Sequence, residues 1–172
     1  MNTQLKLSTN LLITLLGIVG FSYNALAGDA KVFPGSNCHY GALTPSSNVK
    51  YDSTGFIYNN STTHSALISC PIVKDVVFSG VNELNLVKIR YRKPTSVGFN
   101  CTIHSRTNSG TGGLQKSQWD FGFAGVKTMS LPSVGGFLKG AYTLSCILPP
   151  SKSPVSTASN RSGIYHYRIN EK

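Results

Sequence analysis

Three cations stand at alternate positions near the middle of the chain, where they could bind an anion. They are Lys88, Arg90 and Arg92, and Lys93 follows at once. Side chains two apart on a β-strand point the same way, so the three form one row, with Lys93 at its end. Arginine side chains bind sulfate and phosphate through two parallel hydrogen bonds. The row therefore predicts an anion-binding site made of Lys88, Arg90, Arg92 and Lys93.

The same row has a second interpretation. Lys and Arg on an edge strand keep that edge from pairing with another chain. The row would then protect the fold and bind nothing. The sequence leaves both interpretations open.

The sequence contains no motif whose residue types and spacing indicate a catalytic or metal-binding site. The four histidines (His39, His64, His104 and His166) lack the spacing that places two imidazoles on one metal. No carboxylate pair suggests a glycosidase, and no Gly-x-Ser-x-Gly motif is present. We therefore predict no metal, no cofactor and no enzyme. A hydrolase remains the alternative, because a Ser-His-Asp triad is recognised by geometry and not by spacing.

The four cysteines predict two disulfides. They are Cys38, Cys70, Cys101 and Cys146, and an even count in an exported chain is typical of a disulfide framework. Four cysteines allow three connectivities, and the sequence does not choose among them. We favour Cys38–Cys70 with Cys101–Cys146, the second pair stapling two strands through the core.

The N-terminus has the pattern of an export signal. Lys6 precedes an apolar run, and Ala25-Leu26-Ala27 offers a cleavage site of the Ala-x-Ala kind. We expect residues 1–27 to be a cleaved signal peptide and residues 28–172 to form one domain in the periplasm or outside the cell. The formal net charge is +10, which favours anionic partners such as an acidic glycan, lipopolysaccharide or a phospholipid surface. Nucleic acid is not favoured, and the charge could instead serve solubility alone.

Alternating apolar residues predict several short strands and no helix. The clearest is Leu84–Arg92, whose Val87, Ile89 and Tyr91 should point inward. Other expected strands are 55–59, 65–73, 99–103, 119–126, 128–131, 142–148 and 164–169. In the strand 119–126 we expect Trp119, Phe121 and Phe123 in phase on a buried face, while residues 28–36 should be an exposed lead-in. Such a series of strands predicts an all-β fold, an antiparallel β-sandwich of jelly-roll or Greek-key type.

One set of motifs resembles a known group of proteins. Gly55-Phe56-Ile57-Tyr58-Asn59, Cys70-Pro71-Ile72, Cys101-Thr102-Ile103 and Cys146-Ile147-Leu148 stand before a tyrosine-rich terminal segment. This pattern resembles small exported proteins of proteobacteria. The resemblance implies a two-disulfide β-sandwich and carries over no catalytic residue.

Two functions follow as expectations. The first is a non-enzymatic protein that binds an anionic envelope glycan or lipid headgroup. The second is a structural or protein-interaction β-sandwich without a small ligand. The sequence does not identify its protein partners.

Overall fold

The structure is a computed structural model that describes residues 30–74, 84–109, 113–137, 140–153 and 157–171. The expected signal peptide lies outside these residues and stays a prediction. The strands are β1 (Ala30–Pro34), β2 (His39–Tyr40), β3 (Val49–Tyr51), β4 (Ile57–Asn59), β5 (Ala66–Ile72), β6 (Leu84–Lys93), β7 (Phe99–Arg106), β8 (Gly113–Asp120), β9 (Gly125–Leu131), β10 (Ala141–Leu148) and β11 (Ser162–Glu171). Three short 3-10 turns, Gly35–Asn37, Ser46–Asn48 and Ala158–Asn160, are the helical elements of this part. None of its helices is long and apolar enough to cross a bilayer.

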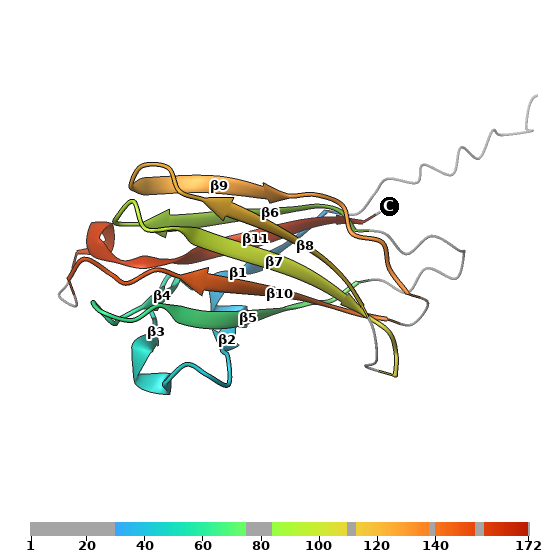
Figure 1. The fold of residues 1–172 in the computed structure, drawn as a ribbon, viewed down its shortest axis with the longest axis horizontal. Helices are drawn as coiled ribbons and strands as arrows, with labels where there is room; N and C mark the ends of the chain where they lie inside the picture. Colours follow the sequence, from blue (N-terminus) through green and yellow to red (C-terminus); the bar gives the residue numbers. More distant parts are fainter. Residues whose placement is uncertain (1–29, 75–83, 110–112, 138–139, 154–156, 172) are drawn as a thin grey trace, which may run out of the picture.

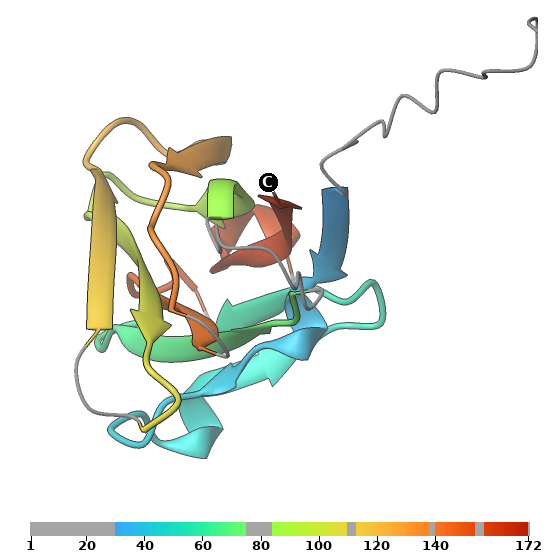
Figure 2. The same ribbon diagram turned by 90° about the vertical axis from the view of Figure 1, so that its right-hand side faces the viewer.

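The strands form two antiparallel sheets that pack face to face (Figures 1 and 2). One sheet has the order β3-β4-β11-β6-β9, with β1 also paired to β11, and the other has the order β2-β5-β10-β7-β8. From β4 onward, these orders are those of a jelly roll. The predicted all-β sandwich is therefore confirmed, and of the two topologies offered it is the jelly roll.

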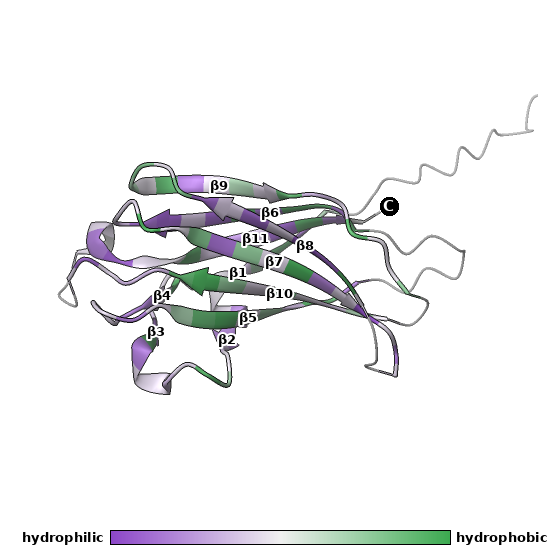
Figure 3. Cartoon of the chain, viewed as in Figure 1, coloured by the Kyte–Doolittle hydropathy of each residue, from purple (hydrophilic) through white to green (hydrophobic). Residues whose placement is uncertain are grey.

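The core lies between the sheets, where alternate residues of each strand meet. Val87, Ile89 and Tyr91 of β6 are buried, as predicted, and face the buried side chains of β7 and β10. Figure 3 shows the corresponding alternation of apolar and polar residues along the strands. This period of two determines which side chains of each strand reach solvent.

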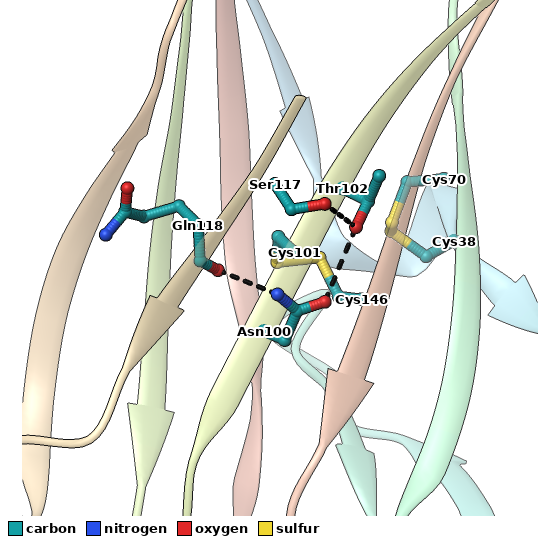
Figure 4. The surroundings of a disulfide bond; sticks show 8 residues. All are labelled: Cys38, Cys70, Asn100, Cys101, Thr102, Ser117, Gln118 and Cys146. Atoms are coloured by element: carbon teal, nitrogen blue, oxygen red, sulfur yellow. Dashed lines mark hydrogen bonds between the residues drawn. A yellow bond between two sulfur atoms is a disulfide. The ribbon is translucent and has the colours of Figure 1, made fainter. Parts of the chain in front are cut away.

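Both disulfides of the favoured pairing are present. Cys38–Cys70 ties the segment before β2 to β5, and Cys101–Cys146 joins β7 to β10 (Figure 4). Cys101 stands directly opposite Cys146 in the register of one sheet. The second disulfide therefore links neighbouring strands, whereas we expected it to cross the core.

Two predicted segments are different in the structure. Residues 30–34 form β1, paired with the terminal strand β11, where we expected a lead-in. The expected strand 119–126 is interrupted: β8 ends at Asp120, and β9 begins at Gly125, whose φ of 139° suits glycine. Because the chain turns there, Phe121 and Phe123 are exposed instead of buried. Trp119 is exposed too, because in β8 it stands opposite Asn100 on the outer face of the sheet.

Candidate functional site

The predicted basic row lies in the middle of a sheet. β6 is hydrogen-bonded to β11 on one side and to β9 on the other. Lys88 and Arg90 are exposed on its outer face, and Arg92 is half-buried there. The edge-protection interpretation is therefore wrong, because β6 has no free edge along the paired residues.

β11 adds a further cation, Arg168, and an imidazole, His166, beside this row. In the antiparallel register, Arg168 stands opposite Lys88, and His166 stands opposite Arg90. We call these five residues (Lys88, Arg90, Arg92, His166 and Arg168) the basic face. On the other side of β6, the hydroxyl-bearing Ser130 and Thr128 stand opposite Lys88 and Arg90.

No described acid balances the basic face. Of the acids whose side chains the structure describes, Asp52 lies in the turn before β4 and Asp120 at the end of β8. Directly opposed like charges destabilise a sheet, so the pairing of Arg168 with Lys88 costs stability. A bound anion would remove this cost, which makes the basic face the best candidate site.

Aromatic packing orients one arginine of this face. The guanidinium carbon of Arg92 lies 5.5 Å from the centre of the Tyr165 ring. Tyr165 sits at a register irregularity of β11 and stacks on the buried Phe56, with ring centres 4.4 Å apart. Arg168 is also oriented, because its Nε donates to Asn170 Oδ1 at 3.2 Å. These contacts reduce the conformational freedom that binding would otherwise remove.

Lys93 is not part of the basic face, which corrects the predicted site. It is buried, because it continues the inward phase of Val87, Ile89 and Tyr91. Its Nζ donates to the backbone oxygen of Asp120 at 2.8 Å and lies 3.3 Å from Asp120 Oδ2. A charge buried in this way needs its partner, so Lys93 has a structural function and is unavailable to a ligand.

Asp120 joins β8 to the opposite sheet. Its carboxylate accepts hydrogen bonds from the Tyr91 hydroxyl at 2.5 Å, from Lys127 Nζ at 3.2 Å and from the Gly122 amide at 2.8 Å. Burial alone would raise the pKa of this carboxyl, but these hydrogen bonds and the charge of Lys93 lower it to about 2. Burial and the same contact raise the pKa of the Tyr91 hydroxyl. We call this cluster (Tyr91, Lys93, Asp120 and Lys127) the Asp120 clasp.

A polar hollow of about 310 Å³ lies beside the clasp, between β8 and β9. Its lining residues are Tyr91, Gln118, Trp119, Asp120, Lys127, Thr128, Met129 and Ser130. The one carboxylate that lines it, that of Asp120, already bonds to Tyr91, Lys93 and Lys127. The hollow therefore offers no free acid or base. Among the described residues, no group of His, Cys, Asp and Glu could hold a metal ion.

Comparisons with known proteins give similarity of fold alone. No family model matches the chain, and no curated protein matches it. A Podospora anserina GH26-CBM35 β-(1,4)-mannanase has 11% identity and a TM-score of 0.46 over 84% of this chain, which corresponds to 28% of that protein. A family 35 carbohydrate-binding module from Clostridium thermocellum has 14% identity and a TM-score of 0.44, covering 81% of this chain and 98% of the module. The C-terminal CBM6 of a laminarinase from Zobellia galactanivorans has 16% identity and a TM-score of 0.43, covering 83% of this chain and 99% of the module. At this level of similarity, the function has to be argued from the surface of the chain itself.

The outer face of the other sheet differs in chemistry from the basic face. Asn100, Thr102 and Ser117 lie on it and hydrogen-bond among themselves and to the backbone of Gln118 (Figure 4). These groups are neutral and largely satisfied by one another. We call Asn100, Thr102 and Ser117 the neutral face. The exposed Arg106 lies outside it, at the end of β7.

Sequence reasoning missed two parts of this surface. The contribution of His166 and Arg168 depends on pairing between β6 and β11, which lie far apart in sequence. The exposure of Phe121 and Phe123 depends on a turn, for which Gly122 and Gly125 were the available signal. The exposure of Trp119 depends on the pairing of β8 with β7.

Proposed function

We propose that the chain is a non-enzymatic binding protein that recognises the sulfate, carboxylate or phosphate groups of an anionic envelope glycan through the basic face. The observation that supports this most directly is the juxtaposition of Lys88, Arg90, His166 and Arg168 on two central strands without a described acid. Disulfides are typical of exported proteins, so the chain would meet such glycans in the periplasm or outside the cell.

The spacing of the cations fits a charged polymer better than one small ion. Residues two apart on a strand are roughly 7 Å apart, and neighbouring strands are about 4.8 Å apart. The face is an open part of a sheet, and its charges form a small array. A polymer with repeated anionic groups can contact several of them at once.

The described acids do not favour an enzyme. A glycosidase needs two facing carboxylates. Asp52 accepts hydrogen bonds from Thr54 and the Phe56 amide, and Asp120 is held by the clasp. Neither carboxylate is free to transfer a proton to a ligand on the basic face.

The test removes charge from the basic face without changing its packing. We expect Arg90→Gln with Arg168→Gln to weaken binding to an immobilised sulfated polysaccharide by roughly tenfold at low salt, since charge-assisted hydrogen bonds are lost. The melting temperature should stay unchanged or rise slightly, because both side chains are exposed and the Arg168–Lys88 repulsion is removed. Retention on the polysaccharide at increasing salt gives the first quantity, and thermal unfolding gives the second.

The matched control is Arg106→Gln, which removes an exposed arginine from β7 on the other sheet. It should alter retention much less than the double variant. Equal losses from Arg106→Gln and from the double variant would mean that retention reflects net charge alone. Soluble lipopolysaccharide and anionic vesicles, tested as competitors, distinguish a glycan from a lipid headgroup as the source of the anionic group.

A further inference from the structure

Exposed apolar side chains gather at one end of the sandwich, next to the Arg92 end of the basic face, since Arg92 stands opposite Val126. They are Val97, Trp119, Phe121, Phe123 and Val126, which we call the aromatic end. Phe123 is 88% exposed and Phe121 is 69% exposed. The pairing of Phe99 with Asp120 and of Lys93 with Gly125 places the loop 94–98 beside the loop 121–124. Clustered exposed apolar groups mark an interaction surface.

The aromatic end has a defined shape. The rings of Trp119 and Phe121 stack with centres 5.3 Å apart and planes 7° apart. Phe121 also lies against Gly98, where an added Cβ would come within 2.7 Å of its ring. The Gly122 amide donates to Asp120 Oδ1, which ties the loop to the Asp120 clasp. Trp119 and Phe121 are therefore held in place by contacts within the chain, and the backbone of the loop that carries Phe123 is tied to Asp120.

The shape favours a broad surface over a small ligand. The connection between β8 and β9 arches outside the two sheets in both views (Figures 1 and 2). Small ligands bind in concave sites, whereas Phe123 lies on a projecting loop. The nearby hollow is polar, and it does not enclose Phe121 or Phe123.

The charge around the aromatic end is positive. Lys127 stands at its base and is 31% exposed, and Arg92 lies on the neighbouring strand. Asp120 is the described acid nearest to it, and both Lys93 and Lys127 neutralise that carboxylate. Apolar aromatic groups with cations behind them match the interface of an anionic bilayer, where aromatic rings enter and basic groups remain at the headgroups.

We propose that the aromatic end docks on the surface of an anionic phospholipid bilayer, with Phe121 and Phe123 entering the interface and Trp119 at its boundary. This site adjoins the basic face at Arg92 but depends on the aromatic side chains. It takes a lipid surface where the basic face takes a soluble polyanion. The protein could then hold a glycan while resting on a membrane.

Vesicle binding tests this directly. The probe is vesicles of equal parts phosphatidylcholine and phosphatidylglycerol, with phosphatidylcholine vesicles as the neutral comparison. We expect the wild-type chain to float with the anionic vesicles, and the emission of Trp119, the one tryptophan of the chain, to move to shorter wavelength. Phe123→Ser should weaken the association about tenfold, because the transfer of one large apolar side chain is lost. Phe121→Ser with Phe123→Ser should weaken it further.

The control is Leu43→Ser, which removes a side chain of similar exposure, 91%, far from the aromatic end. It should leave vesicle binding unchanged. The proposal is overturned if the wild type does not bind the vesicles, or if Phe123→Ser binds as well as the wild type. It is also overturned if the Trp119 emission responds to a neutral oligosaccharide without lipid, or if Phe123→Ser only dissociates a dimer. The retention assay on sulfated polysaccharide contains no lipid. A failure of vesicle binding can therefore be distinguished from a failure of glycan binding by the basic face.

Discussion

Replacing Asp120 by alanine should lower the free energy of unfolding by about 3 kcal/mol, the lower end of the cost of breaking a buried ion pair. Lys93 is fully buried and would lose its carboxylate partner, while Tyr91 would lose the acceptor of its hydroxyl. We choose the lower end because the Asp120 side chain keeps 18% exposure. Denaturation in urea measures the loss.

The same carboxylate should make stability depend on acid pH. In the folded protein its pKa is lowered from 3.8 to about 2. A lowered pKa gives stability that is present above the unfolded value and is lost as pH falls. The wild type should therefore lose stability from about pH 4 toward pH 2, and Asp120→Asn should lack this part of the loss.

The matched control is Lys127→Ala. Lys127 contacts the same carboxylate but is 31% exposed, so its removal should cost less than about 1 kcal/mol. If Asp120→Ala costs no more than Lys127→Ala, the Asp120 clasp does not hold the two sheets together as described.

Removing the Cys101–Cys146 disulfide should have a similarly large effect. The two cysteines are 45 residues apart, and a loop of that length corresponds to about 4 kcal/mol in the chain-entropy model. We expect Cys101→Ala with Cys146→Ala to lose about that much, measured by chemical denaturation. Alanine avoids placing a hydroxyl among buried apolar groups.

The other disulfide provides the comparison. Cys38–Cys70 closes 32 residues, so its paired alanine variant should lose slightly less. Mapping of non-reduced peptides should find these two links and no free thiol. A link between Cys70 and Cys101, or an unchanged midpoint after the alanine substitutions, would contradict the assignment.

The inward and outward positions of the strands were predictable, because the period of a strand is two. Val87, Ile89 and Tyr91 alternate with Lys88 and Arg90 in the sequence, and the structure buries the first set and exposes the second. The cysteines likewise indicated two disulfides, which the structure contains. Both inferences depend only on local order or on composition.

The errors came from contacts between distant segments. By phase alone Lys93 belongs with Tyr91 on the inner face, whereas we placed it at the end of the outer row. The decisive partner, Asp120, lies 27 residues away and cannot be identified from spacing. Strand order also decides whether β6, which carries Lys88, Arg90 and Arg92, lies at the edge or in the centre of its sheet. The same order places Arg168 beside Lys88. Alternation carries no information about which strands become neighbours.

The most direct test of the proposed function is to locate a bound sulfated oligosaccharide by chemical-shift changes of backbone amides. We predict that the largest changes lie on β6 and β11, at Lys88, Arg90, His166 and Arg168, and that added salt removes them. The changes should be absent in the variant with Arg90→Gln and Arg168→Gln. Changes centred instead on Asn100, Thr102 and Ser117 would place the ligand on the neutral face, and they would contradict binding through the basic face.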